Sequence, residues 1–254
     1  MSSTMTWLND PANWRGDAGT TGIAAQLVSH LEYSGAALGI ALVIALPLGL
    51  AIGHTGKGTW AVTVVNGIRA LPTVGLLILF YVLLSSRISG GGDAVFFIPT
   101  LIVLVLLAMP PILANTYAGV QNVNPSTNDA AVGMGMTGRQ VLTQVEFPNA
   151  LPLIFSGLRS ATLQVIATAT VAAYVGLGGL GRFLYDGLGN HDFGELTGGA
   201  ILVALLALVA DLVLMLIQRY AVSRGVSGRF SRHLRADART AEVVSDDAAA
   251  SVAA

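Results

Sequence analysis

The sequence predicts an all-α polytopic membrane protein with five transmembrane helices. Hydrophobic residues make up 54% of the 254 residues and charged residues only 11%, a composition too apolar for a soluble domain of this length. The apolar residues gather into five runs, each close to the ~20 residues that cross a bilayer core as a helix. There is no cysteine, which excludes disulfides and thiolate metal sites, and the four histidines show no metal-ligand spacing.

The five apolar runs are separated by polar or glycine-rich segments. Their predicted limits are residues 29–53, 59–85, 94–114, 151–175 and 196–218. The first run is uncharged over residues 34–53, and Pro47 within it is expected to bend the helix. The second carries Pro72 in its first half, and the third has Pro110 and Pro111 near its far end. Membrane helices tolerate proline because neighbouring groups satisfy the freed backbone carbonyls.

The two ends of the chain differ from the apolar runs. Residues 1–28 are polar and glycine-rich, lack the basic region and cleavage site of a signal peptide, and contain Trp7 and Trp14 as candidate interfacial anchors. Residues 221–254 are charged and then rich in alanine and serine, a composition typical of disorder. We therefore expect an extracytoplasmic N-terminal segment, a transmembrane domain over residues 29–220, and a disordered cytosolic tail.

Lysine and arginine are unevenly divided between the two sides of the predicted membrane. Positive residues collect on the cytosolic side, in short loops and near the ends of spans. An extracytoplasmic N-terminus puts seven inside and three outside: Lys57, Arg139, Arg219, Arg224, Arg229, Arg232 and Arg235 against Arg15, Arg87 and Arg182. The bias predicts that residues 124–150, between the third and fourth runs, lie in the cytosol together with the C-terminus.

The polar segment between the third and fourth runs carries the signals of two short helices. Ser126 with Asp129, and Thr137 with Gln140, have the spacing of a capping box, in which two side chains satisfy free amides at a helix start. Pro148 cannot continue a helix, so the second helix is expected to end before it. We interpret the segment as a helix-turn-helix elbow; a plain polar loop is the alternative.

A second pattern in this segment is an acidic-Ala-Ala triplet, a glycine four residues on, and an apolar-x-apolar-Pro ending. Its residues are Asp129, Ala130, Ala131, Gly135, Val145, Phe147 and Pro148. The pattern resembles the EAA signature of ABC-importer permeases, with Asp, Val and Phe in place of the usual Glu, Ile and Leu. The resemblance implies a type I ABC importer permease fold and a coupling helix that seats in a groove of a cytosolic ATPase. Small residues permit such close approach, and an acid in the first turn suits the helix dipole.

Further stretches are similar to permeases of the osmoprotectant branch, which import glycine betaine, choline, carnitine or proline betaine. They are residues 66–72, 157–162, 167–170 and 175–181, and the last apolar run, which contains Asp211. The similarity covers about residues 30–220, and importers of methionine share much of it. It implies a pair of permeases, as two copies or with a sister permease, above two ATP-binding subunits. An extracytoplasmic substrate-binding protein would deliver the solute, which an aromatic cage in that protein selects by cation–π attraction.

Two glycine-rich motifs do not fit nucleotide binding. Residues 176–181 match G-x-G-x-x-G, but the dinucleotide fingerprint needs a preceding strand, so a flexible or close-packed break outside the fourth run is the better interpretation. Residues 56–59 lack a phosphate loop's first glycine, because Ala51 occupies that position. We therefore expect a transport subunit without a cofactor or enzymatic activity of its own, whose ATP is bound and hydrolysed by a partner chain.

Three ionisable residues lie within apolar runs: Arg69, Arg159 and Asp211. An unpaired charge there costs roughly 2.5–3.5 kcal/mol and usually faces a partner or a water-filled cavity. Arg159 follows Pro152 by seven residues and Asp211 precedes Arg219 by eight, so both lie about 10–12 Å from the cytosolic end of their spans. We expect them to form a buried ion pair between the fourth and fifth spans, in preference to a substrate site.

Three tyrosines near span ends are candidate residues of a transport pathway: Tyr81, Tyr117 and Tyr174. Tyrosine at such positions is more often an interfacial anchor, which is the alternative here.

The expected mechanism is alternating access, in which closure of an ATPase pair draws the coupling helices together and the spans rock to open outward. An ion-coupled secondary transporter or channel, with Asp211 and Arg159 as coupling charges, is a rival from another class. A non-transporting scaffold is a third. Neither rival explains a small-residue cytosolic elbow.

Overall fold

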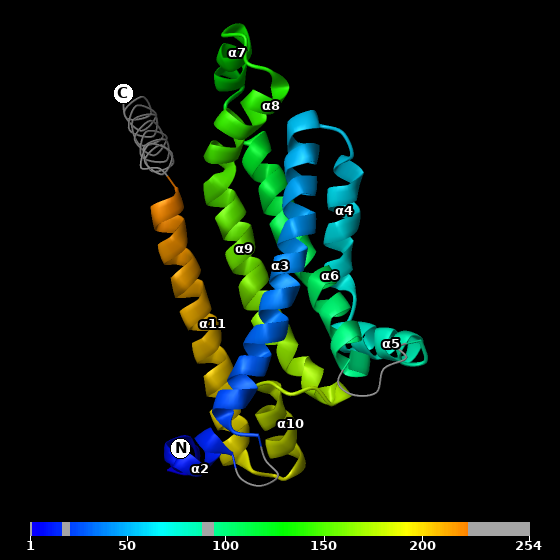
Figure 1. The fold of residues 1–254 in the computed structure, drawn as a ribbon, viewed down its shortest axis with the longest axis vertical. Coiled ribbons are helices and arrows are strands. Elements are labelled where there is room, and N and C mark those ends of the chain that lie inside the picture. Colours follow the sequence, from blue (N-terminus) through cyan, green and yellow to red (C-terminus); the bar gives the residue numbers. More distant parts are fainter. Residues whose placement is uncertain (1, 17–20, 88–93, 223–254) are drawn as a thin grey trace, which may run out of the picture.

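The computed structural model describes residues 2–16, 21–87 and 94–222, and the regular structure of these residues is entirely helical (Figure 1). Four long helices run side by side: α3 (Ile23–Thr55), α6 (Ala94–Gln121), α9 (Phe147–Ala169) and α11 (Phe193–Ala221). Each belongs to a continuous helical stretch that is long and apolar enough to cross a membrane. With the bent pair described next, these spans confirm the predicted all-α membrane fold and a helix count near five.

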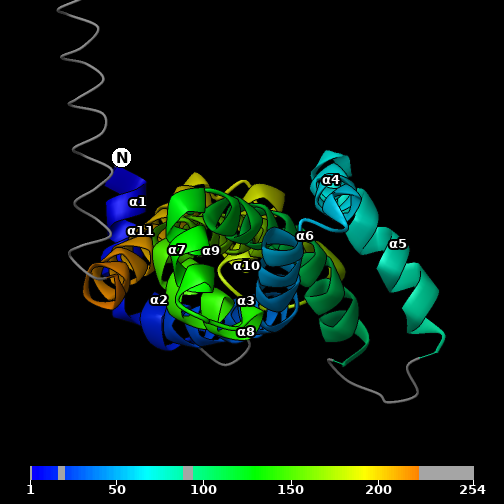
Figure 2. The same ribbon diagram turned by 90° about the horizontal axis from the view of Figure 1, so that it is seen from above.

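The second predicted span is a pair of helices with a sharp bend between them. It consists of α4 (Thr59–Gly67), the 3-10 turn η1 (Ile68–Ala70) and α5 (Thr73–Ser85), with a bend of 96° at the break. The prediction of one continuous helix was wrong because Pro72 has no amide hydrogen and forces the preceding residue out of the helical region. Leu71 is accordingly extended, at φ −79° and ψ 136°. Seen along the long axis, α4 and α5 lie to one side of the bundle, opposite α11 (Figure 2).

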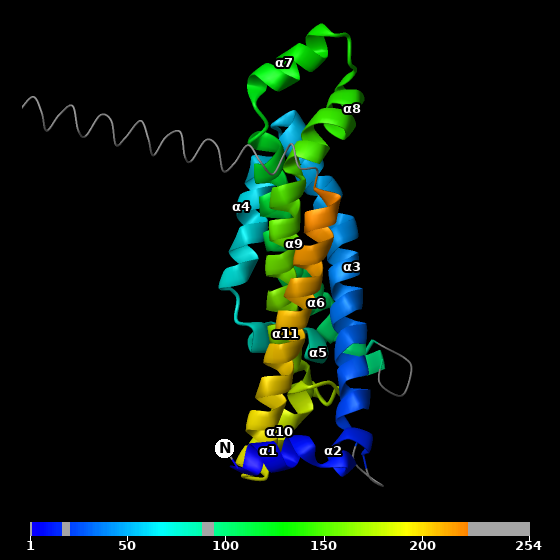
Figure 3. The same cartoon turned by 90° about the vertical axis from the view of Figure 1, so that its left-hand side faces the viewer.

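Short helices occupy the two ends of the bundle (Figure 3). The elbow projects from one end and contains α7 (Pro125–Gly133), α8 (Gly138–Gln140) and the π-helix η2 (Val141–Glu146). The other end holds α1 (Ser2–Asn9), α2 (Pro11–Arg15), the 3-10 turn η3 (Thr170–Val175) and α10 (Gly181–Gly189). We refer to these as the elbow end and the outer end. The predicted disordered tail lies beyond residue 222, outside the described residues.

The centre of the bundle is formed by α3, α6 and α9, which approach closely through small residues. Ala37, Ala41 and Ala45 of α3 are completely buried in this core. A Cβ added to Gly49 of α3 would lie 2.7 Å from Thr116 of α6, so a larger residue would separate the helices. Tight packing through small residues is typical of membrane helices, which lack a hydrophobic driving force for association.

The N-terminal segment packs on the outer end of α11. Trp7 meets Phe183 of α10 edge-to-face, with ring centroids 5.2 Å apart, and a Cβ on Gly198 of α11 would lie 2.4 Å from the Trp7 ring. Trp7, expected to be an interfacial anchor, is therefore a packing residue between helices. Trp14 is exposed, as an anchor would be, and donates its indole hydrogen to the Leu8 carbonyl.

Candidate functional site

The elbow begins with α7, whose start differs from the predicted capping box. The side chain of Asn124 accepts a hydrogen bond of 2.9 Å from the Ser126 amide, so Asn124 is the capping residue. Pro125 then occupies the first turn, where its missing amide hydrogen and fixed φ are favourable. The predicted cap at Ser126 was wrong because that proline starts the helix before Ser126.

The turn between α7 and α8 depends on Gly135, which has a φ of +85°. Only glycine adopts this region without strain. No other part of the described chain lies within 4 Å of a Cβ placed there. The next helix starts as predicted, because Thr137 and Gln140 form the expected capping box, with the Thr137 amide 2.7 Å from Gln140 Oε1.

The first half of the acidic-Ala-Ala pattern is divided between the surface and the interior of the elbow. Asp129, Ala130 and Gly135 are exposed, whereas Ala131 is only 2% exposed. The chain folds back over Ala131, whose carbonyl accepts a hydrogen bond of 3.1 Å from the Met136 amide. The expectation that Ala131 permits close approach by another protein was therefore wrong, because its small size serves packing inside the elbow.

The second half of the pattern lies where the elbow joins α9. Val145, Phe147 and Pro148 are half-buried, and Phe147 packs against a cluster that contains Val120 and Ile154. The helix does not end before Pro148 as predicted. The π-helix η2 instead leads directly into α9, with this proline as the second residue of α9. The junction is therefore one continuous helical connection into the membrane.

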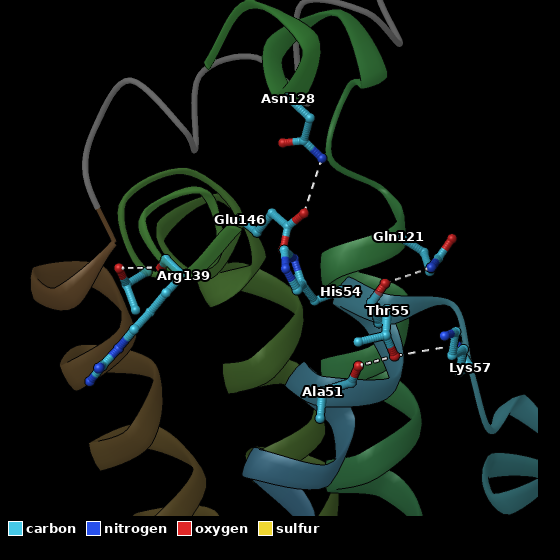
Figure 4. Close-up of polar contacts among 10 residues, drawn as sticks. Ala51, His54, Thr55, Lys57, Gln121, Asn128, Arg139 and Glu146 are labelled. Carbon is cyan, nitrogen blue, oxygen red and sulfur yellow. Dashed lines mark hydrogen bonds and ion pairs between the residues drawn. The ribbon is translucent and has the colours of Figure 1, made fainter. Parts of the chain in front are cut away.

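A polar cluster at this junction was not predicted. Glu146, the last residue of η2, is 5% exposed, yet its carboxylate has two partners from distant parts of the chain (Figure 4). Oε2 lies 2.7 Å from Nδ1 of His54 at the end of α3, and Oε1 accepts a hydrogen bond of 3.1 Å from Nδ2 of Asn128 in α7. We call these three residues the Glu146 cluster. No sequence spacing relates residues 54, 128 and 146; the only signal was a carboxylate between apolar residues.

Two of the three intramembrane charges form an ion pair. Arg159 Nε lies 2.7 Å from Asp211 Oδ1, and Arg159 Nη2 lies 2.7 Å from Oδ2. The predicted pairing of the fourth and fifth spans is confirmed. The side chains are 31% and 24% exposed, so the pair lies at the edge of this chain and is not fully buried as expected.

Arg69, the third intramembrane charge, stands apart from this pair. It lies in η1, at the break of the second span, and is exposed. No ion pair or hydrogen bond joins its side chain to another residue in the described part of the chain. Among the described residues, this charge therefore has no partner at the bend between α4 and α5.

The three candidate tyrosines do not converge. Tyr81 of α5 stacks on Phe96, Tyr117 packs against the core formed by α3, α6 and α9, and Tyr174 of η3 meets Tyr185 of α10. Their ring contacts are with separate neighbours, so the structure does not gather them into one site.

The glycine-rich loop 176–181 is held by polar residues of α3. Tyr33 donates its hydroxyl hydrogen to the Gly178 carbonyl, and Gln26 accepts a hydrogen bond from the Gly179 amide. Gly179 has a φ of +99°, and the Tyr33 hydroxyl occupies the position that its Cβ would take. The predicted close-packed break is therefore present at the outer end.

Comparison with known proteins relates most of the chain to one family. Residues 41–225 match the family described as binding-protein-dependent transport system inner membrane component. The chain is 36% identical over 200 residues to the glycine betaine/carnitine/choline transport system permease protein OpuCB of Bacillus subtilis, covering 78% of this chain and 88% of that protein. It is 34% identical to the osmoprotectant import permease protein OsmW of Salmonella typhimurium, covering 80% and 94%.

Solved structures show the same fold at lower identity. The inward-facing MetNI methionine ABC transporter aligns with a TM-score of 0.68 at 19% identity, covering 88% of this chain and 100% of that chain. An amino acid ABC transporter aligns with a TM-score of 0.60, also at 19% identity, covering 78% and 91%.

Proposed function

This chain belongs to the family of binding-protein-dependent transport system inner membrane components, and from that premise we propose that it moves a quaternary ammonium osmoprotectant inward across the membrane. The substrates named for its relatives are glycine betaine, carnitine and choline; proline betaine is chemically similar. The observation that carries the proposal is the similarity to these permeases along most of the chain. Transport is by alternating access, driven by ATP that a separate subunit binds and hydrolyses.

The elbow is the proposed contact with the ATP-binding subunit. Asp129, Ala130 and Gly135 present small and acidic groups on its exposed surface. Beside them, Val132 is 61% and Met134 is 78% exposed. Apolar residues at the tip of a projecting, otherwise polar element are typical of a protein-binding surface. The elbow would be cytosolic, and the N-terminus would lie outside.

Arg69 is proposed to face the substrate pathway or the second permease. An exposed charge within a span is unfavourable against lipid, so it requires a partner or water. Broken spans in transporters commonly line such cavities. Asp211 and Arg159 already satisfy each other, which favours a structural role for that pair over ion coupling. The second permease and an extracytoplasmic substrate-binding protein complete the proposed assembly.

Uptake of radiolabelled solutes tests the substrate class. The permease, its ATP-binding subunit and its binding protein are expressed in a strain without betaine, choline or methionine importers. We expect uptake of at least one of glycine betaine, choline, carnitine and proline betaine, and none of methionine. Uptake of methionine alone would contradict the osmoprotectant assignment and favour the alternative substrate class.

A further inference from the structure

The Glu146 cluster joins three elements that are far apart in sequence. His54 ends the first span α3, Asn128 lies in the middle of α7, and Glu146 ends η2, which continues into α9. The two contacts of 2.7 Å and 3.1 Å use different oxygens of the same carboxylate. When the Glu146 carboxylate is ionised it only accepts hydrogen bonds, and Nδ1 of His54 is then the donor of this contact. Glu146 therefore connects the elbow directly to α3.

Burial makes this connection hard to break. The Glu146 side chain is 6% accessible, and its Oε2 contacts His54. The Arg139 side chain extends away from Glu146 (Figure 4). A buried carboxylate that loses a partner bears the full cost of its desolvation. Movement of α7 that left α3 behind would separate the cluster, so the two elements are expected to move together.

The first span carries such a movement to the opposite end of the molecule. α3 has 33 residues and is about 50 Å long at ~1.5 Å per residue. Near its elbow end, the carbonyl of Gly53 accepts a hydrogen bond of 2.8 Å from Gln121 of α6, which holds the two helices together. Near its outer end, Gln26 and Tyr33 bind the backbone of the glycine-rich loop.

We propose that Glu146 is a positioning residue that couples displacement of α7 to α3, and through α3 to the glycine-rich loop at the outer end. The proposal rests on the proposed function, because it takes α7 as the element that the ATP-binding subunit moves. The Glu146 side chain is only 6% accessible, so it would act from inside this chain and not on the docking surface. Its role is to convert movement of the docked ATP-binding subunit into a movement of the first span. Loss of Glu146 would therefore uncouple ATP hydrolysis from transport.

The test uses the complete importer in proteoliposomes, with permease, ATP-binding subunit and substrate-binding protein. Asn128→Asp places a second carboxylate against Glu146 and breaks their hydrogen bond by repulsion. Asn128→Asp combined with Glu146→Gln exchanges carboxylate and amide, which restores a hydrogen bond between the same two positions. Lys57→Gln is the matched control, since it changes one charge at the same end of α3 outside the cluster.

Three quantities are measured for each variant: the ATP-binding subunit that co-purifies, basal ATP hydrolysis, and substrate transported per ATP. Asn128→Asp should leave the first two near wild type, because the Asn128 side chain faces Glu146 inside the elbow and lies apart from the exposed residues proposed for docking. It should lower transport per ATP by about tenfold, the scale of one charged hydrogen bond. The exchange variant should recover most of this loss, and Lys57→Gln should show none.

Other results overturn the inference. Unchanged transport per ATP in Asn128→Asp, or an exchange variant no better than Asn128→Asp alone, would show that the cluster does not couple the two elements. If the amount of co-purifying ATP-binding subunit fell in proportion to transport, Glu146 would only shape the docking surface and would not couple the two elements. Failure of the wild-type permease to retain any ATP-binding subunit would instead contradict the proposed function itself.

Discussion

Arg159 of α9 and Asp211 of α11, 52 residues apart in the chain, meet through two contacts of 2.7 Å each. Two parallel hydrogen bonds between a guanidinium and a carboxylate are the strongest geometry for this pair. The residues of α11 that are buried are Gly194, Gly198 and Gly199, all at its outer end. Toward its elbow end, where α11 has no buried residue, this ion pair joins it to α9, together with a hydrogen bond of 3.4 Å from Gln218 to the Pro152 carbonyl.

Replacing Asp211 by alanine should impair assembly, because it leaves the Arg159 charge unpaired within a span. An unpaired arginine there costs roughly 2.5–3.5 kcal/mol, and the partial exposure of the pair reduces this figure. We expect the amount of folded permease in membranes to fall several-fold, and Arg159→Met in the same chain to restore it.

The matched control for that experiment is Asp186→Ala, which removes the partner of Arg182 on the surface of α10, where an ion pair contributes little. Its expression should equal wild type. An unchanged amount of the Asp211→Ala permease would show that the pair is dispensable.

Gly135→Leu should leave membrane insertion intact while reducing both retention of the ATP-binding subunit and uptake. A leucine at φ +85° costs roughly 1–2 kcal/mol of backbone strain, so the turn between α7 and α8 should rearrange. Gly135→Asn should recover part of the loss, because asparagine tolerates the left-handed region better. Equal loss in both variants would instead indicate close contact with the partner subunit, since nothing in the described chain lies within 4 Å of this position.

Topology reporters test the orientation of the chain. A reporter fused after Ala94 should report outside, and reporters after Asn128 and Gly225 should report inside, because of the bias of lysine and arginine. The Ala94 and Asn128 fusions lie on either side of α6. Inside signals from both would show that this helix does not cross the membrane.

Gly179→Ala should destabilise the outer end, because its methyl group would occupy the position of the Tyr33 hydroxyl at a φ of +99°. Tyr33→Phe should have a smaller effect, about 0.5–1.5 kcal/mol for the lost hydrogen bond to the partly buried Gly178 carbonyl. Gly189→Ala is the control, since a Cβ there meets nothing within 4 Å and its φ is not positive. Melting of the purified permease measures all three, and equal melting of Gly179→Ala and Gly189→Ala would contradict the packing described for this loop.

The fold was largely accessible from the sequence because span length and apolar composition are local properties. The capping box at Thr137 was likewise set by a short spacing along the chain. The matching distances of Arg159 and Asp211 from the elbow end were set by short spacings within α9 and within α11. The break at Pro72 was underestimated, since a proline in a membrane helix is compatible with either a mild bend or an interruption.

What the sequence did not reveal depends on contacts between distant segments. The Glu146 cluster brings together residues 54, 128 and 146, and the two apolar neighbours of this glutamate are too weak a local signal to distinguish it from a solvated one. Ala131 was misjudged for the same reason, because its burial results from the fold of the elbow around it. Tyr33 and Gln26 hold the glycine-rich loop from the opposite end of the chain, which no spacing could indicate.

The central claim, that this chain is the permease of an ATP-driven osmoprotectant importer, is tested most directly by transport in proteoliposomes. The purified permease with its ATP-binding subunit is reconstituted in vesicles with ATP inside, and loaded binding protein is added outside. Our account predicts that labelled osmoprotectant accumulates only when ATP and the binding protein are both present, with no response to an imposed sodium or proton gradient. Accumulation driven by such a gradient without ATP would contradict it and would identify a secondary transporter.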